Sequence, residues 1–585
     1  MSRLIVMSIL IPLAATTLQP APSVRARGAA SGIMQGVVST TKGNARQRID
    51  DDDKDGRDKR DKDDRDKDDD DALFPNQRVG HPDTTILEKY SLVKIAQGSD
   101  PLENPSGVIT KFGYLNDFPP QLIEPTKTEP DENTYLVLKQ NPGGPTPHYD
   151  YGRHFLFQGH ENAANLAYIT RINLDVTDPA HRITLLTPVG SDGKTRFNSI
   201  DGSTWNPFTR TLLFTQENGS SGGVIEVTPD WPPTVRTLDG VLGKAGYEGI
   251  HPDDKGNLLI IEDSGGTSVN VDPSNPNSPK AARNPNSFVY RFVPNDPEDL
   301  SAGGKLQALQ VLIGGAPLMF VPVDATHPTG DVFSNAQLHL HTPGTTWPTH
   351  WVTVHDTAVN GAAAFDANAA AKAAGATPFK RPENAQFLPG SGFDTFFFDV
   401  TGDTNADSGN QQALAARGAW GAIFRVDFPR GGETGLISIV VLGTAEQASF
   451  DNLAFLNSHT LLAAEDRGDT LHKQLNLLDS VWAFNVHSGS FHSSRSSSQR
   501  FIALGRDPQS ELDAMLRDAG APGFQNEGDN EPTGLHVSDG SASVHKILGK
   551  AANLNKARKF FTQQHGRTTS TRSCAPRIKG LSDNS

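Results

Sequence analysis

One unit of sequence recurs along this chain and constrains its fold more than any other feature. In each copy an acidic residue precedes an apolar stretch, a turn and a second apolar stretch, and an acidic pair follows fourteen residues after the first acid. The clearest copies span residues 248–263 and 451–466, and residues 203–218 keep the frame without the first acid. Two apolar stretches of similar length around a turn predict an antiparallel hairpin.

A third apolar stretch follows most of these hairpins, and further copies of the unit are recognisable. The third stretches lie at residues 223–227, 287–292, 422–426 and 481–486, and the further copies at residues 154–162, 383–401 and 533–547. Short strand triplets that recur five or six times predict an all-β fold, and specifically a β-propeller. The alternative is a β-sandwich, which has no reason to repeat one such unit.

The units are separated irregularly, so the predicted propeller carries loop insertions and few short helices. Long insertions are expected at residues 270–286 and 330–376. Helices are expected at residues 362–374, which are rich in alanine, and at residues 507–519, which contain Glu, Leu and Met.

The spacing of the acids predicts where they meet. Because the two strands of a hairpin match in length, the first acid and the acidic pair end on the same side, opposite the turn. A propeller directs the equivalent ends of its blades toward one face around a central channel. The acids expected on this single rim are Glu161, Glu217, Glu248, Glu262, Asp263, Asp451, Glu465 and Asp466.

Carboxylates crowded in this way take up protons or bind cations. An oxygen-rich cluster without thiolates suits calcium, magnesium or manganese, and the hard iron(III) ion also fits. The alternative for each acid is a structural role, in which it caps a strand or accepts hydrogen bonds from a turn. Repetition of the acids in register favours the metal-binding interpretation.

A cation accompanies the acid of one copy. In the register of the repeat Glu383 takes the place of Glu248, and Arg381 precedes it by two residues. Arginine offers a planar fork of donors suited to a phosphate or a carboxylate. The sequence therefore predicts that Arg381 reaches toward the same rim; the alternative is a simple Arg–Glu surface pair.

The two ends of the chain differ from its middle. Residues 1–30 combine a short basic start with an apolar run and small residues, which predicts a secretory signal peptide rather than a membrane span. Residues 31–72 are predicted to be a disordered, charged spacer, and residues 567–585 a polar, basic, disordered tail. The propeller domain is assigned to residues 73–566, and the mature protein is expected to have no membrane span.

Charge and cysteine content exclude some classes of protein. The net charge of −15 argues against nucleic-acid binding and agrees with affinity for cations. Cys574 is the single cysteine, so an intrachain disulfide and a zinc site built from several thiolates are both excluded.

Seven segments, in this order along the chain, resemble the PhoX-type alkaline phosphatases, a family of secreted, metal-dependent β-propeller enzymes. They are Gly159-His-Glu161-Asn, Ser203-Thr-Trp-Asn-Pro with Gln216-Glu217, Tyr247-Glu248-Gly, Ile261-Glu262-Asp263, Arg381-Pro-Glu383, Phe450-Asp451-Asn-Leu and Phe560-Phe-Thr-Gln-Gln-His-Gly566. The resemblance covers residues 73–566. It implies a six-bladed propeller whose rim holds calcium and iron ions and hydrolyses phosphate monoesters.

The resemblance also implies roles for single residues. Glu383 would be a metal ligand at the reaction centre, Arg381 would bind the substrate phosphate and stabilise its developing charge, and the strand-end acids would hold the other metals. The family has a cysteine ligand for iron just before the Thr-Trp segment, whereas residues 197–203 of this chain contain no thiol. Asp201 would supply an oxygen ligand there, which favours calcium over iron and indicates a divergent member.

The leading hypothesis is therefore a secreted or periplasmic, monomeric phosphatase that acts on small phosphorylated substrates with bound Ca2+. One alternative is a non-catalytic calcium-binding propeller that serves as an extracellular binding module. Another is a phytase-like or lactonase-like propeller hydrolase, in which carboxylate-bound calcium serves a different substrate.

Overall fold

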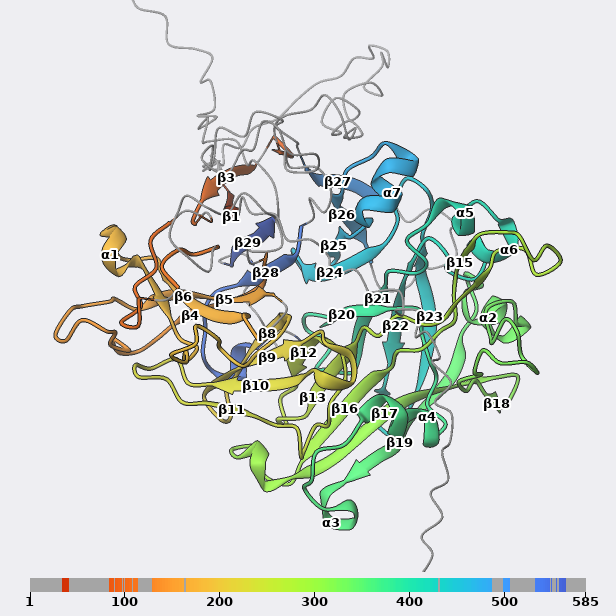
Figure 1. The fold of residues 1–585 in the computed structure, drawn as a ribbon, viewed down its shortest axis with the longest axis horizontal. Helices are drawn as coiled ribbons and strands as arrows, with labels where there is room; N and C mark the ends of the chain where they lie inside the picture. Colours follow the sequence, from red (N-terminus) through yellow and green to blue (C-terminus); the bar gives the residue numbers. More distant parts are fainter. Residues whose placement is uncertain are drawn as a thin grey trace, which may run out of the picture.

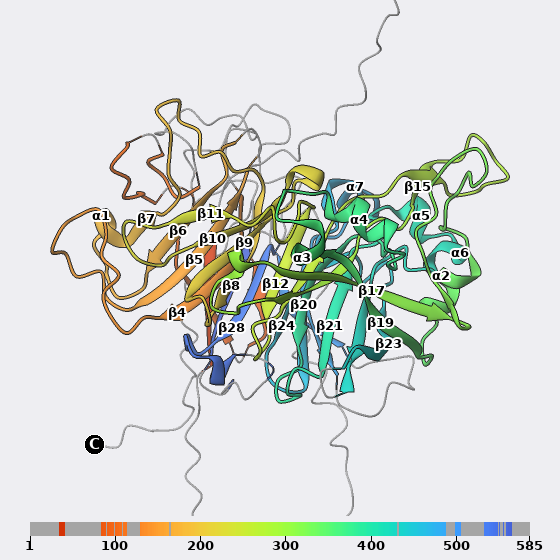
Figure 2. The ribbon, with the colours of Figure 1, turned by 90° about the horizontal axis from the view of Figure 1, so that it is seen from below.

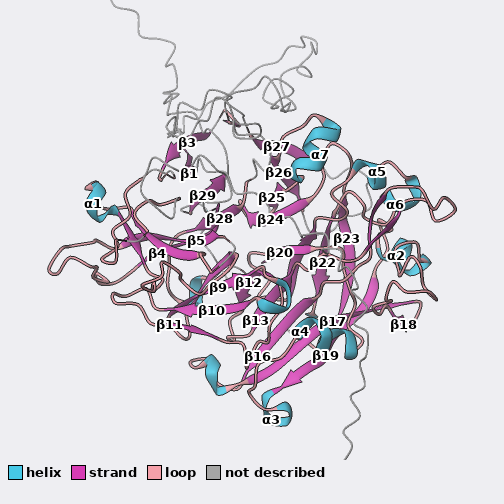
Figure 3. Ribbon diagram, viewed as in Figure 1, coloured by secondary structure: helices cyan, strands magenta, loops and turns pink. Residues whose placement is uncertain are grey.

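The computed structural model describes residues 34–40, most of residues 84–113 and most of residues 129–563, with longer gaps at residues 487–497 and 505–531. These residues form mainly antiparallel β-strands, and the short helices lie toward the periphery (Figure 3). The predicted all-β class is confirmed. The predicted signal peptide, the predicted helix at residues 507–519 and Cys574 lie outside the described residues.

Most strands belong to four-stranded meanders, numbered here as sheets 1 to 6. Sheet 1 contains β4 (Glu129–Val137), β5 (His154–Glu161), β6 (Tyr168–Asn173) and β7 (Ile183–Leu185). Sheet 2 contains β8 (Ile200–Asn206), β9 (Thr211–Gln216), β10 (Gly223–Val227) and β11 (Val235–Thr237). Sheet 3 contains β12 (Tyr247–Pro252), β13 (Leu258–Glu262), β16 (Val289–Pro294) and β17 (Gly304–Ile313).

The remaining sheets repeat this order. Sheet 4 contains β20 (Pro382–Phe387), β21 (Thr395–Val400), β22 (Ala422–Asp427) and β23 (Thr434–Leu442). Sheet 5 contains β24 (Phe450–Phe455), β25 (Thr460–Glu465), β26 (Ser480–Asn485) and β27 (Ser498–Ala503), with β2 (Thr85–Ile86) at its edge. Sheet 6 contains β28 (Gly534–Ser538), β29 (Arg558–Gln563), β1 (Met34–Thr40) and β3 (Tyr90–Lys94).

Strand β1 comes from the range that the sequence assigned to the spacer. It pairs with β29 on one side and with β3 on the other, both antiparallel. Sheet 6 therefore combines the beginning and the end of the described chain. Its apolar positions are few and flanked by charged sequence, so no repeat or long apolar run marked this strand.

The first strands of the six sheets surround a common centre. We call β4, β8, β12, β20, β24 and β28 the inner strands. Each contacts the next in this order, and β28 contacts β4, so the ring of contacts is complete. Figure 1 shows the sheets spread outward from this centre.

The hydrophobic core is divided into clusters between neighbouring sheets, because side chains alternate between the two faces of a strand. In β13, Leu258 and Ile260 pack toward sheet 2, whereas Leu259 and Ile261 pack toward sheet 4. Equivalent clusters lie between sheets 1 and 2, 4 and 5, 5 and 6, and 6 and 1. The strands are buried on both faces, which explains why they read as continuous apolar runs.

Insertions occupy the outside of this arrangement. Strand β19 (Trp347–Asp356) joins sheets 3 and 4 at their outer edges, β14 (Ser268–Asn270) pairs with β15 (Lys280–Arg283), and β18 (Ala316–Pro317) pairs with β17. The α-helices are α1 (Pro179–Arg182), α2 (Asn335–Leu340), α3 (Thr357–Asn360), α4 (Ala367–Ala373), α5 (Ala406–Gly409), α6 (Gln412–Ala415) and α7 (Gly468–Leu475). Figure 2 shows α4, α5 and α7 toward the same face of the molecule. Helix α4 confirms the helix expected at residues 362–374, over a shorter range.

Candidate metal centre

Five of the six inner strands contain a β-bulge at an equivalent position, near the start of the strand. In β12, residues Tyr247 and Ile250 pair with Glu262 and Ile260, so the inner strand has one residue more than its partner. The same shift of register occurs in β4, β8, β20 and β24. A bulge bends its strand and redirects a side chain. The bulged residues come in pairs: Asp131-Glu132, Asp201-Gly202, Glu248-Gly249, Glu383-Asn384 and Asp451-Asn452.

The first member of every bulged pair is a carboxylate, and the five carboxylates converge. Together with acids from the ends of second strands they line one small cavity, which we call the acid pit. Its lining residues are Asp131, Glu161, Asp201, Glu217, Glu248, Arg381, Glu383, Asp451 and Asp466. Seven of the ten predicted metal-binding acids and the predicted arginine therefore lie together.

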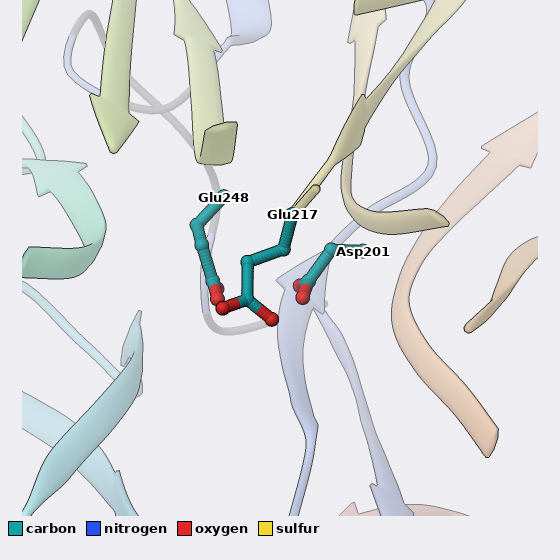
Figure 4. A group of neighbouring side chains, drawn as sticks. All are labelled: Asp201, Glu217 and Glu248. Carbon is teal, nitrogen blue, oxygen red and sulfur yellow. The ribbon is translucent and has the colours of Figure 1, made fainter. Parts of the chain in front are cut away.

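Two groups of three carboxylates within the acid pit have the spacing of metal ligands. Asp201, Glu217 and Glu248 form one group, and Figure 4 shows their carboxylates directed toward one another. Glu248, Glu383 and Asp451 form the other. In each group the oxygen atoms lie within 4.8 Å of one another. Glu248 belongs to both groups, so the geometry suits two cations that share a ligand.

The buried carboxyl groups of the acid pit must either stay protonated or be neutralised by bound cations. Burial, reinforced by the neighbouring carboxylates, raises the pKa of Asp131, Asp201, Glu248 and Asp451 well above the usual value of a carboxyl group. Burial likewise raises the pKa of Glu383 to about 7. Such groups either hold protons or bind cations. Because the donors are all carboxylate oxygens, the residues fit hard cations such as Ca2+, Mg2+, Mn2+ or Fe3+.

The acid pit contains one guanidinium group, that of Arg381. Its side chain is 6 % exposed, its Nη2 atom lies 2.8 Å from Asp263 Oδ2 and 3.1 Å from Glu383 Oε1, and its Nε atom donates to Asp263 Oδ2 over 2.8 Å. Its backbone has a φ of +54°, which is unfavourable for a residue other than glycine. This strain is held in place by Thr401, whose backbone N–H donates to the Arg381 carbonyl over 2.8 Å.

Asp263 differs from the other predicted acids because its carboxylate contacts the guanidinium group of Arg381. It is buried, it orients Arg381, and its Oδ1 atom has no hydrogen-bond partner among the described residues. A buried carboxylate oxygen without a hydrogen-bond donor suits a cation or an ordered water, so the atom agrees with metal binding next to the arginine.

Glu262 and Glu465 do not lie in the acid pit, contrary to the expectation that both members of each acidic pair face the rim. Glu262 accepts hydrogen bonds from Tyr290 Oη (2.8 Å), Phe288 N (3.1 Å) and Asn368 Nδ2 (2.7 Å). Glu465 accepts bonds from two backbone N–H groups and from Arg467 Nη2. Adjacent side chains of an extended strand point to opposite faces, so only one acid of each pair can reach the pit.

Sequence reasoning missed two acids of this region, both in β4. Asp131 lines the acid pit, and Glu132 follows it in the chain and is buried. The segment Pro130-Asp131-Glu132-Asn133 parallels Pro382-Glu383-Asn384, and this similarity was the available signal. The segment stood outside the predicted copy of the unit, which began at the second strand.

Sheets 4 and 6 lack part of the acid set. Thr401 follows β21 where the other second strands are followed by acids, and its hydroxyl donates to Glu383 Oε1. Thr533 precedes β28 where the other inner strands carry a carboxylate, and its hydroxyl donates to the carbonyl of Pro130. The acid pit is therefore asymmetric, and Arg381 lies on the side of sheet 4, where a hydroxyl replaces a carboxylate.

Comparison with known proteins gives one family. The family model described as Alkaline phosphatase PhoX matches residues 268–478 of the 585. This range contains Arg381, Glu383, Asp451 and Asp466, and the match confirms the resemblance carried by the sequence motifs. Among curated proteins, none matches this chain.

Two solved structures have similar backbones at low identity. TolB from Acinetobacter baumannii is 8 % identical, with 75 % of this chain and 65 % of that chain covered and a TM-score of 0.27. The PQQ-bound aldose sugar dehydrogenase from Streptomyces coelicolor is 12 % identical, with 74 % and 99 % covered and a TM-score of 0.25. Scores this low support no argument about function. Within the described residues no helix is long and apolar enough to cross a membrane.

Proposed function

We propose, from the match of residues 268–478 to the PhoX alkaline phosphatase family, that this chain is a metal-dependent phosphatase that hydrolyses small phosphate monoesters in the acid pit. The observation that carries the proposal is the position of Arg381. A guanidinium group lies among eight carboxylates, next to one of the two groups that fit a metal ion. A protein that only stores or senses calcium has no need of a cation there, whereas phosphate binding does.

Because the acid pit is rich in carboxylates, cations must bind to it before a phosphate ester can. A phosphate dianion is repelled by a cavity lined by eight carboxylates and one guanidinium group. Asp201, Glu217, Glu248, Glu383 and Asp451 would hold the cations, and Ca2+ fits this oxygen donor set; Fe3+ is the second candidate. When bound, such cations neutralise phosphoryl charge and lower the pKa of a coordinated water molecule.

The chain's own residues then position the substrate. The Arg381 guanidinium is fixed by Asp263 Oδ2, which lies 2.8 Å from both Nε and Nη2, and by Glu383 Oε1, which lies 3.1 Å from Nη2. A guanidinium group held in this way presents a planar fork of N–H donors. These donors suit the phosphate oxygens and the charge that develops on them during phosphoryl transfer. Thr401 holds Glu383 by a hydrogen bond and limits its rotation.

The proposal extends to the architecture and the location of the protein. The six meanders, the complete ring of inner strands and the clusters between neighbouring sheets support a six-bladed propeller over residues 73–566. The signal-peptide pattern of residues 1–30 supports export, and hence a secreted or periplasmic enzyme. We propose that this enzyme acts as a monomer.

Metal analysis combined with hydrolysis of an aryl phosphate tests the function. The purified full-length protein should contain bound metal and hydrolyse the ester, and a chelator should abolish hydrolysis until metal is restored. Arg381→Lys keeps the charge but loses the fork of donors, so kcat/KM should fall by about 100-fold with metal content retained. Arg425→Lys, in the partly exposed pair with Asp427, is the matched control. Bound metal without hydrolysis of any phosphate ester would refute the phosphatase and support the calcium-binding module.

A further inference from the structure

The second residues of the bulged pairs form a layer directly beneath the acid pit. Glu132, Asn384 and Asn452 are large and polar, whereas Gly202 and Gly249 are glycines, and Gly534 stands at the equivalent place in β28. The three polar side chains are 4 % exposed or less. We call these three side chains the axial plug.

The glycines make room for the axial plug. A Cβ atom on Gly249 would lie 2.8 Å from Asn384 Oδ1 and 2.9 Å from its Cα atom. A Cβ atom on Gly534 would lie 3.0 Å from the Cα atom of Glu132. Side chains at Gly249 and Gly534 would therefore collide with Asn384 and Glu132, whereas a Cβ atom on Gly202 would lie 2.3 Å from the Glu248 carbonyl oxygen.

Asn384 is the hub of the axial plug. Its Nδ2 group donates to Glu132 Oε1 and, over 3.1 Å, to Asn452 Oδ1. Its Oδ1 atom lies 3.1 Å from Nε2 of His251, and its backbone N–H donates to Asp399 over 2.9 Å. One side chain from β20 therefore links β4, β12 and β24, three strands that have no backbone ladder to β20 or to one another at this point.

The axial plug is connected to the carboxylates above it. Asn452 Nδ2 donates to Asp451 Oδ1 over 3.0 Å, and Glu132 Oε2 accepts from the backbone N–H of Ser203 over 2.8 Å, which brings in β8. Asn384 itself follows Glu383 in the same bulge. The network thus joins five inner strands, and its members adjoin three of the five bulge carboxylates, Asp131, Glu383 and Asp451.

A second cavity lies on the other side of the axial plug. It has a volume of about 110 Å3 and is lined, on the inner strands, by Thr134, Ser203, His251, Gln386, Ala454 and His536. Along each bulged strand a residue of the acid pit comes first, a residue of the plug layer second and a residue of this cavity last. The plug layer therefore separates the acid pit from this second cavity.

We propose that Asn384 is a positioning residue that fixes the spacing of the metal-binding carboxylates by tying their strands together beneath the acid pit. The inference rests on the proposed function for the presence of metal. Partners of metal ligands usually affect affinity by holding the ligands in place. Because Asn384 provides the donors, replacing its amide by a carboxylate opposes Glu132 with like charge and separates the strands.

Calcium titration calorimetry on the metal-stripped full chain tests this. Asn384→Asp preserves the shape of the side chain and should weaken Ca2+ binding by about tenfold or more. Asn206→Asp is the control: Asn206 is fully buried at the opposite end of β8, where its Oδ1 accepts from Phe208 N over 3.1 Å. The control adds the same buried charge outside the plug and should change Ca2+ affinity by less than about twofold.

A double variant exchanges donor and acceptor. In Glu132→Gln with Asn384→Asp, the new amide of residue 132 donates to the new carboxylate, and its carbonyl still accepts from Ser203. Ca2+ affinity should recover most of the loss, which a general loss of stability would not do. If Asn384→Asp does not fold, Asn384→Ala removes the donors without adding charge and should weaken Ca2+ binding in the same way.

The outcomes separate this inference from the proposed function. An Asn384 variant with wild-type Ca2+ affinity, a control that loses as much affinity, or a double variant without recovery would each overturn the positioning role. A wild-type protein that binds Ca2+ but hydrolyses no phosphate ester refutes the phosphatase alone, because the ratio of affinities still measures the role of Asn384.

Discussion

The Oδ2 atom of Asp263 accepts a hydrogen bond from Nε of Arg381 over 2.8 Å and forms an ion pair with its Nη2 atom, also at 2.8 Å. The two residues are 118 positions apart and come from neighbouring sheets. Both are almost fully buried, so the contact is a charge-assisted pair that fixes the direction of the guanidinium group. Asp263, predicted as a metal ligand, therefore has at least this second task.

Asp263→Asn should impair catalysis more than metal binding. The amide keeps the size of the side chain but holds the guanidinium group less firmly, and misplacement of a substrate-binding group costs roughly 10- to 100-fold in kcat/KM. Steady-state kinetics with an aryl phosphate, beside metal analysis, measures both effects. Asp427→Asn, which breaks the more exposed pair with Arg425, is the control and should leave kcat/KM unchanged. Equal kinetics in the two variants would contradict the orienting role.

Neighbouring acids of one pair should behave in opposite ways. Glu465 is fully buried and pairs with Arg467 over 2.6 Å, so Glu465→Gln should destabilise the protein by about 3 kcal/mol or more. Asp466 lines the acid pit, so Asp466→Asn should weaken Ca2+ binding without that loss. Chemical denaturation of the metal-free proteins and calcium titration give the two quantities. Loss of Ca2+ affinity in Glu465→Gln at unchanged stability would reverse the assignment.

The stability of the metal-free protein should fall as pH rises. Burial raises the pKa of Glu132 and of Glu383 to about 7, above the value of 4.5 for a free glutamate. The folded state therefore binds more protons than the unfolded state between these values, and the free energy of unfolding decreases from about pH 4.5 to about pH 7.

Calcium should remove this loss, because cations replace the protons of the carboxylates. The increase in Tm on adding Ca2+ should thus be larger at about pH 7.5 than at about pH 5. Thermal melts at both pH values, with and without chelator, provide the measurement. A calcium effect that is the same at both values would mean that the acid pit does not hold the metal.

Asp131→Asn tests the carboxylate that the repeat did not predict. Asp131 lies beside Asp201 and Glu161 in the acid pit, and burial, followed by the charges of these two acids, raises its pKa. Removing one negative charge should lower the number of bound cations or weaken the weakest site by about tenfold. Elemental analysis after dialysis, compared with Asp427→Asn, reports the change. Unchanged stoichiometry and affinity would place Asp131 outside the metal-binding set.

Several elements were predictable because they depend on local sequence. The hairpin formed by β12 and β13 has the ends and the turn that the unit implied, and β10 has the predicted bounds, residues 223–227. Period and turn signals act over a few residues, so one sequence suffices to recognise them. The match of residues 268–478 to one family confirms what the motifs indicated.

Other features depend on contacts that no local pattern records. Strand β1 completes sheet 6 through pairing with a strand more than 500 residues away in sequence. The axial plug needs Gly249 beside Asn384 and Gly534 beside Glu132, and these four residues come from four different sheets. Such complementarity appears only when the strands are packed side by side.

For the acids, the sequence predicts their positions along the strands, whereas the tertiary structure determines which of them lie together. The sequence by itself determined that carboxylates recur at strand ends on one side of the hairpins, since spacing along a strand fixes which end a residue reaches. Only the tertiary structure decided which carboxylates meet. A one-residue bulge turns Glu383 and its counterparts inward, and strand alternation turns Glu262 and Glu465 away into hydrogen bonds of the framework.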